Sequence, residues 1–223
     1  MKYFPNRPGF ATGLAIMGFG FASLIAGPLM QFLVAQVGLV NNFIILGVIY
    51  LVVMGASSLY LKAPQPKQPP RTTKDKSTMY VHNHGMLAND AMKTWQFGAL
   101  WWIFFINITC GIGLLSLASP MAQEAIGMTP AAAASLVGII GIFNGGGRIA
   151  WSTISDYFGR AQTYILFFII QIIAFYVLAE TNNALTFQVL ILLIITCYGG
   201  GFACMPAYLA DLYGIRQLST IHG

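Results

Sequence analysis

One arginine stands inside an otherwise apolar stretch, GIIGIFNGGGRIAW, which covers Gly138 to Trp151. Arg148 lies seven residues before Ser155, where the apolar run ends. A helical rise of about 1.5 Å per residue therefore places it roughly 10 Å inside the run. Burying an arginine at the centre of a membrane helix costs about 2.5–3.5 kcal/mol on insertion scales. Such a cost predicts a partner for the guanidinium group, unless the side chain extends back to the membrane boundary.

The chain offers this arginine no acidic partner on its own helix face. Its neighbours one helical turn away are Asn144, Gly145, Trp151 and Ser152. The carboxylates outside the polar linker all stand at the ends of apolar runs, at Glu124, Asp156, Glu180 and Asp211. Because a guanidinium fork binds a carboxylate bidentately, the sequence favours a small carboxylate ligand in a water-accessible cavity. A counter-ion on segments outside this chain is the alternative.

A small set of polar and aromatic side chains could complete such a cavity. The candidates for binding the substrate are Arg148, Asn144, Tyr198, Phe202 and Asn107. Tyr198 and Phe202 are one turn apart on the same helix face, so their rings could wall a small carboxylate. Ordinary packing within a helix bundle is the alternative role for the polar and aromatic candidates.

The apolar runs that carry these residues are long enough to cross a bilayer. The chain is 57% hydrophobic and 8% charged, against about 25% charged residues in soluble domains. A crossing helix needs about 20 mostly apolar residues. Apolar runs cover 9–37, 41–61, 96–123, 129–155, 163–178 and 185–209, and the run at 163–178 needs its flanking residues to reach that length. We therefore predict an all-α, polytopic membrane protein with six transmembrane helices.

The positions of the cationic residues predict the orientation in the membrane. Lys and Arg prefer the cytoplasmic ends of membrane helices. With six crossings, every one of the 11 Lys and Arg residues except Arg148 falls on one side, while the opposite turns hold Glu124 and Glu180. Both ends of the chain are therefore predicted to be cytoplasmic, in an integral protein of the plasma (inner) membrane. Membrane lipid is the expected surrounding, and no nucleic-acid partner is needed to explain the basic charge.

A polar segment divides the chain into two parts. Residues 62–94 are basic and rich in proline, and they predict a flexible cytoplasmic linker. It joins 1–61, with two transmembrane helices, to 95–223, with four. His82 and His84 lie in the linker without further ligands at suitable spacing, so no metal or cofactor is predicted. Glycine triplets in two later runs predict close helix packing, and bending of these helices during a conformational cycle is the second interpretation.

Several longer motifs resemble one family of membrane carriers. The stretches KYFPNRPGFATGLAIMGFGFASLIAGPL, SLASPMAQE, IFNGGGRIAWSTISDYFGR and CYGGGFACMPAYLADLYG are similar to segments of the oxalate:formate antiporter family, within the major facilitator superfamily. The resemblance covers nearly the whole chain and implies the fifth to tenth helices of a twelve-helix carrier. It implies four further helices before this stretch and two after it, which would be its partners.

The same resemblance assigns roles to individual residues. In that family an arginine on the eighth helix contacts substrate carboxylate, and it falls on Arg148. The related monocarboxylate transporters carry an aspartate where this chain has Asn144, so a proton relay is not implied. Asp156, Gly159 and Arg160 match the superfamily's cytoplasmic signature G-x-x-x-D-x-x-G-R, although glycine is usual at its first position, where this chain has serine. They form the predicted conformational gate, which latches neighbouring helix ends in one state and releases them in the other.

These observations predict secondary active transport of small organic anions by alternating access. The expected substrates are mono- or dicarboxylates such as oxalate, formate, lactate or pyruvate, with antiport and proton symport both open. A membrane scaffold or an inactive transporter fragment is the alternative, because two helices of the first half are too few to wall a central cavity. An integral-membrane enzyme would need His, Asp, Glu or Cys converging at one depth. Their positions do not offer that, so no enzymatic activity is predicted.

Overall fold

The computed structural model describes residues 7–60 and 85–222, and every regular element in these two ranges is a helix. The predicted all-α fold is therefore confirmed for the described residues. Helix α6 reaches 21 residues by taking in the flanks of the shortest predicted run. The helices are α1 (Pro8–Tyr60), α3 (Ala88–Ala91), α4 (Trp95–Glu124), α5 (Pro130–Phe158), α6 (Arg160–Glu180), α7 (Ala184–Tyr213) and α8 (Leu218–His222).

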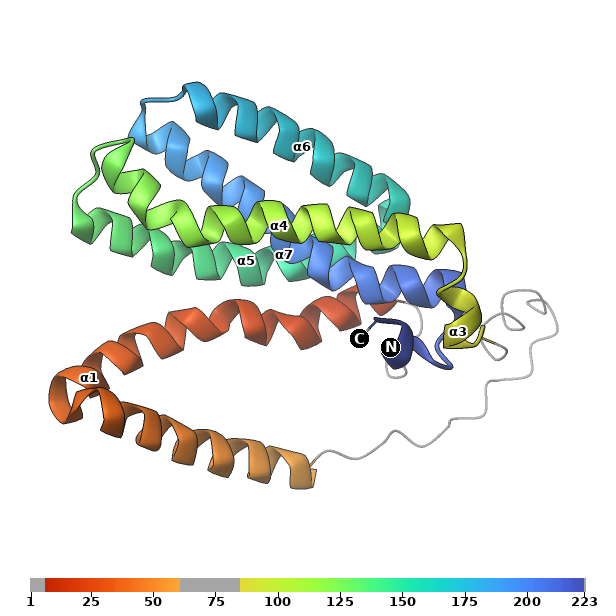
Figure 1. Cartoon of the computed structure of the whole chain (residues 1–223), viewed down its shortest axis with the longest axis horizontal. Helices are drawn as coiled ribbons and strands as arrows, with labels where there is room; N and C mark the ends of the chain where they lie inside the picture. Colours follow the sequence, from red (N-terminus) through yellow and green to blue (C-terminus); the bar gives the residue numbers. More distant parts are fainter. Residues whose placement is uncertain (1–6, 61–84, 223) are drawn as a thin grey trace.

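Helix α1 consists of two arms that meet at Gly38. This residue has φ 81° and ψ 170°, and glycine tolerates a positive φ because it lacks a Cβ. The chain turns back there, so the arms form a hairpin whose ends lie apart (Figure 1). Beside the turn, Asn41 Nδ2 donates to the carbonyl oxygen of Val37 at 3.0 Å. The two arms correspond to the predicted runs at 9–37 and 41–61.

Five stretches of the described helices are long and apolar enough to cross a membrane. A shorter apolar helix, Pro8–Ala22, lies in the first arm of α1. A complete crossing by this arm, which would be the sixth, stays a prediction. The five stretches are Phe32–Tyr60, Trp95–Glu124, Pro130–Phe158, Arg160–Glu180 and Ala184–Tyr213.

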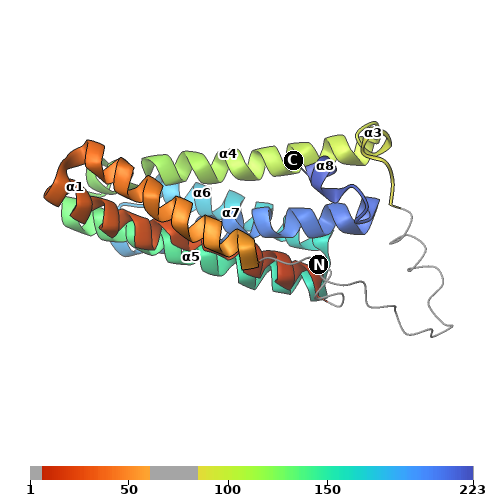
Figure 2. The ribbon, with the colours of Figure 1, turned by 90° about the horizontal axis from the view of Figure 1, so that it is seen from below.

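Helix α7 lies at the centre of the bundle and is the most buried of the five stretches. It packs against α4, α5 and α6, and it also contacts α1 (Figures 1 and 2). Helix α5 packs most extensively against α7 and against α1. A side chain on α5 can therefore contact the central helix and the α1 hairpin at the same time.

The glycine triplets allow the closest contacts between α5 and α7, and both helices run through them without interruption. A Cβ added at Gly147 would lie 2.6 Å from the carbonyl oxygen of Thr196. One added at Gly199 would overlap the carbonyl oxygen of Asn144, whereas one added at Gly146 would meet open space. The predicted close packing is confirmed at Gly147 and Gly199, and bending stays a prediction.

Residues 85–94, at the end of the predicted linker, pack on the end of α7. The amide of Met86 donates to the carbonyl oxygen of Tyr213 at 2.9 Å, which satisfies an acceptor at the end of a helix. The amide of Ala88 donates to Gln217 Oε1 at 2.6 Å, and the hydroxyls of Thr94 and Tyr213 are 2.8 Å apart. The rest of the linker, which carries the H-x-H pair, lies outside the described residues, and the domain boundaries stay predictions.

Candidate functional site

Arg148 of α5 is buried between α1 and α7, with 1% of its surface exposed. Its Nε donates to Asn144 Oδ1 at 3.3 Å, one turn earlier on α5. Its Nη1 donates to the backbone carbonyl oxygen of Ile16 on α1 at 3.2 Å. The ring centres of Phe19 on α1 and Phe202 on α7 lie 4.9 and 5.3 Å from Cζ. The guanidinium group is therefore held within the bundle by contacts with α1, α5 and α7.

One donor of this guanidinium group has no hydrogen-bond partner in the part of the chain that the structure describes. Nη2 is buried and makes no hydrogen bond to any described residue. No described carboxylate forms an ion pair with Arg148, since both ion pairs of these ranges belong to Arg160. A buried cation with an unpaired donor is costly. The arrangement can offset that cost by accepting a small anion, and the N–H bonds of Nη2 suit the planar oxygens of a carboxylate.

Phe202 links Arg148 to the remaining aromatic candidate. Its ring packs edge-to-face against Tyr198, with ring centres 5.4 Å apart, and against Phe104 of α4 at 5.1 Å. Tyr198 in turn packs against Gly111, where an added Cβ would overlap its ring. These ring contacts join α4 to α7, and Phe202 lies between Tyr198 and the guanidinium group. A role of the two rings as the wall of a carboxylate site stays a prediction.

Asn107 on α4 is fully buried and lies against the α7 backbone. A Cβ added at Gly201 would overlap its Oδ1. Both amide atoms of Asn107 are buried and lack a hydrogen-bond partner in the described ranges. Asn107 therefore resembles Arg148 in having buried polar atoms without a described hydrogen-bond partner. Its side chain, however, lies against the glycine triplet of α7 and not against the guanidinium group.

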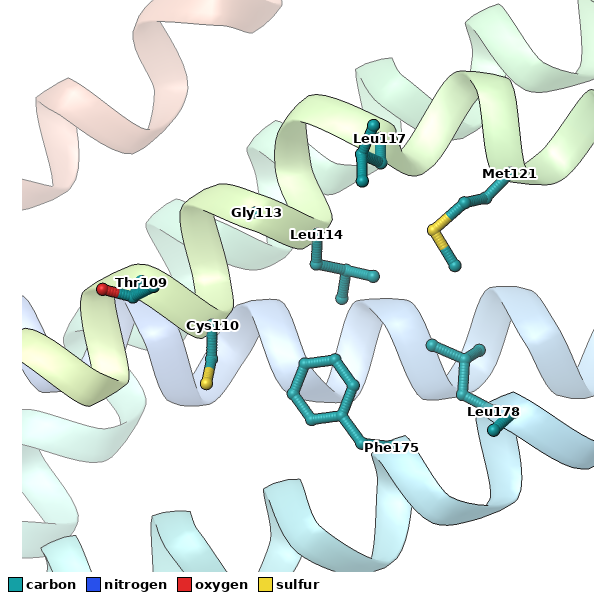
Figure 3. A pocket seen from close by; sticks show the side chains of 9 residues that line it. Thr109, Cys110, Gly113, Leu114, Leu117, Met121, Phe175 and Leu178 are labelled. Carbon is teal, nitrogen blue, oxygen red and sulfur yellow. The ribbon is translucent and has the colours of Figure 1, made fainter.

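Among the cavities lined by described residues, two lie elsewhere in the bundle. The larger, of about 480 Å³, is an apolar groove between α4 and α6 that includes Cys110, Leu114 and Phe175 (Figure 3). The other, of about 380 Å³, lies among α4, α7 and α8 and includes His222, whose pKa is lowered by burial. None of the five predicted binding residues lines either cavity. Among the described residues, no three His, Cys, Asp or Glu side chains converge as metal ligands.

The predicted gate residues meet at the end of the bundle where α1 begins. Asp156, near the end of α5, accepts hydrogen bonds from the amides of Gly9 and Phe10, each at 2.9 Å. These amides belong to the first turn of α1, where N–H groups lack intrahelical partners and the helix dipole is positive. The carboxylate therefore binds the start of α1 to the end of α5. Gly9 permits this approach, because an added Cβ would lie 2.6 Å from Asp156 Oδ1.

Arg160 extends the same cluster to α6 and α7. Its Nη2 lies 2.6 Å from Asp156 Oδ1, and its Nε lies 3.0 Å from Asp211 Oδ2 on α7. Its Nη1 also donates a hydrogen bond to the hydroxyl oxygen of Ser155. Gly159 separates α5 from α6 with φ 97° and ψ 149°, so a single residue provides the sharp turn between Asp156 and Arg160. The cluster joins the ends of α1, α5, α6 and α7.

Sequence reasoning missed the partners that α1 supplies to Arg148 and to Asp156. Ile16 contributes only its carbonyl and Gly9 only its amide, so neither residue type signals the contact. Phe19 is one of many aromatic residues in apolar runs. Asp211 was identified only as a carboxylate at a helix end, and its position two residues beyond the apolar run 185–209 was the available signal.

Comparison with known proteins adds an independent finding. The family model described as Major Facilitator Superfamily matches residues 1–223. The chain is 28% identical over 226 residues to the uncharacterised MFS-type transporter YhjX of Escherichia coli (strain K12), covering 100% of this chain and 54% of that protein. It is 24% identical over 224 residues to the oxalate:formate antiporter of Oxalobacter formigenes, covering 100% of this chain and 52% of that protein. The chain thus spans about half the length of these relatives.

Proposed function

The chain belongs to the Major Facilitator Superfamily, and we propose that it serves in secondary active transport of small organic anions by alternating access. The proposed substrates are mono- or dicarboxylates such as oxalate, formate, lactate or pyruvate. Helices that complete the length of its relatives are its proposed partners, because they would supply the rest of the cavity wall. The similarity to a protein named oxalate:formate antiporter supports this substrate class.

The observation that carries the proposal is the buried Arg148 without a described acidic partner. The side chain is almost fully buried, its Nη2 has no hydrogen-bond partner among the described residues, and no described carboxylate neutralises it. A charged group at this depth costs several kcal/mol, which a bound carboxylate would offset. Asn144 holds Nε in place, and the Phe202 ring supplies a cation–π contact. We assign Asn107 and Tyr198 to the wall of the same site.

The cluster around Asp156 is the proposed gate. In the conformation described here, its carboxylate and Arg160 hold the ends of four helices together. Alternating access requires such contacts to break in the opposite conformation. Because the linker joins α1 to α4 on this side and is basic, we place the gate at the cytoplasmic face of the plasma (inner) membrane.

The test of the site compares Arg148→Gln and Arg148→Lys with the wild type. Loss of one charged hydrogen bond weakens binding by about 1.5–3 kcal/mol, or roughly tenfold to over a hundredfold. Lys keeps the charge but loses the planar fork, so it should be nearly as damaging as Gln. Binding of oxalate, formate, lactate and pyruvate is measured calorimetrically, and uptake is measured with the full-length gene product in proteoliposomes.

Arg7→Gln is the matched control, because Arg7 stacks on the Tyr157 ring at 5.7 Å, away from the site. It should bind carboxylates as the wild type does. Unchanged carboxylate affinity in Arg148→Gln would show that this arginine is structural. Absence of any carboxylate binding or uptake by the wild type would favour the membrane scaffold instead.

A further inference from the structure

The two aromatic rings that lie over Arg148 differ in their surroundings. On the α7 side, Phe202 is fixed by edge-to-face contacts with Tyr198 and Phe104. On the α1 side, Phe19 has its ring against the guanidinium group, yet 72% of its surface is exposed. Phe19 therefore covers the arginine on this side while most of its own surface is left uncovered by the described residues, so moving its ring would uncover the guanidinium group.

The same turn of α1 also occupies a donor that an anion would use. A carboxylate bound end-on to a guanidinium group accepts from both Nη atoms. Nη2 is unpartnered among the described residues, but Nη1 already donates to the carbonyl oxygen of Ile16. This carbonyl lies three residues before Phe19, which is almost one helical turn. One turn of α1 thus supplies both a cover and a competing acceptor.

We propose that the Ile16–Phe19 turn of α1 is a lid that competes with the substrate anion for Arg148. With the lid in place, Nη1 is held by the Ile16 carbonyl and the Phe19 ring covers the group. A carboxylate that binds both Nη atoms displaces the carbonyl and moves the turn away from α5. The proposal rests on the proposed function for the identity of the anion, but the lid itself is defined by the contacts of Arg148 alone.

Chemical modification of Arg148 tests the lid without any substrate. Phenylglyoxal reacts with accessible guanidinium groups, and its rate at Arg148 is followed by peptide mass spectrometry on the chain in detergent micelles. Phe19→Ala should raise this rate about twofold to thirtyfold, the range that loss of one cation–π contact supplies. Phe19→Tyr keeps a ring over the arginine and should react as slowly as the wild type.

Phe21→Ala is the matched control. Phe21 is also an aromatic residue of α1, but its ring packs on α5 at Gly145, where an added Cβ would lie 3.1 Å from it. This variant should leave the Arg148 rate within about twofold of wild type. If Phe19→Ala does not fold, Phe19→Leu replaces it, since Leu fills similar volume without a π face and should still raise the rate. If Phe19→Ala, or Phe19→Leu in its place, reacts no faster than Phe21→Ala, the lid is overturned.

Oxalate binding separates this proposal from the proposed function. If both hold, oxalate protects Arg148 from phenylglyoxal, and Phe19→Ala binds oxalate more tightly by a factor similar to its gain in labelling rate. A faster rate in Phe19→Ala without any oxalate protection would retain the lid and reject the carboxylate substrate. Oxalate protection with no effect of Phe19→Ala on labelling or affinity would retain the substrate class and reject the lid.

Discussion

Replacing Asp156 by Asn should open the contact between α1 and α5. The aspartate accepts hydrogen bonds from the Gly9 and Phe10 amides and pairs with Arg160, and 4% of its side chain is exposed. Charged hydrogen bonds contribute about 1.5–3 kcal/mol each, and a carboxylate at a helix start adds about 0.3–2 kcal/mol. Asn keeps one acceptor oxygen and loses the charge. We therefore expect closure to weaken by about 2 kcal/mol, which is roughly 30-fold in the equilibrium between closed and open states.

The assay measures the distance between α1 and α5 directly. Spin labels are placed at Leu14 and Phe158, which are exposed positions on these two helices, after the three native cysteines are replaced by alanine. Pulsed electron resonance should give one short distance for the wild type and an added longer distance for Asp156→Asn. In proteoliposomes of the full-length gene product, the transport rate should fall by more than the equilibrium affinity for substrate.

Asp211→Asn provides the control for this experiment. Asp211 binds the same arginine through Nε, but the described hydrogen bonds from the start of α1 go to Asp156, and 44% of the Asp211 side chain is exposed. An exposed ion pair contributes about 0–1 kcal/mol, so the label distances should stay close to those of the wild type. Equal opening by both variants, or a loss of affinity at unchanged maximal rate in Asp156→Asn, would refute the gate.

Two further predictions concern packing and topology. Gly147→Ala should destabilise the chain by about 1–3 kcal/mol in detergent melting experiments, because its Cβ would meet the α7 backbone. Gly146→Ala, which meets open space, should be neutral or stabilising by up to about 1 kcal/mol; similar losses in both would contradict the packing argument. A cysteine at Asn182 should react with an impermeant maleimide from the extracytoplasmic side, and one at Ser77 only from the cytoplasm. Labelling of Ser77 from outside would reverse the proposed topology.

The helices could be predicted because each one follows from the local sequence of one apolar run. Each apolar run, with its flanking residues in the case of 163–178, had the length of a bilayer crossing, and each observed helix from α4 to α7 covers most of one run. Contacts between side chains of one helix follow from their spacing alone. Asn144 and Arg148 lie one turn apart and are hydrogen bonded. Asp156 and Arg160, also four residues apart, form an ion pair even though a glycine interrupts the helix between them.

The contacts between helices were not predictable in the same way. The Ile16 carbonyl and the Gly9 amide are backbone groups that every residue possesses, so only tertiary packing selects them. Small residues could have indicated the α1 face, since Gly9, Gly13 and Gly20 recur along the first arm. Glycine in a membrane helix signals close approach but does not identify the partner helix. The identification of α5 as the partner therefore required the structure.

The proposed gate and the proposed arginine site would act on one movement, because Asp156 and Arg148 both bind α1 to α5. The two helices run antiparallel in a constant register: Gly9 meets Asp156, Gly13 meets Ser152, and Ile16 meets Arg148. Eight residues of α5 separate Asp156 from Arg148, or about 12 Å along the helix. Two continuous helices cannot part at one of these levels without straining the other. If the lid moves as proposed, an anion bound at Arg148 favours release of the Asp156 contacts. By thermodynamic reciprocity, release of the Asp156 contacts then favours anion binding. This coupling is what a carrier needs in order to open its gate when substrate is bound.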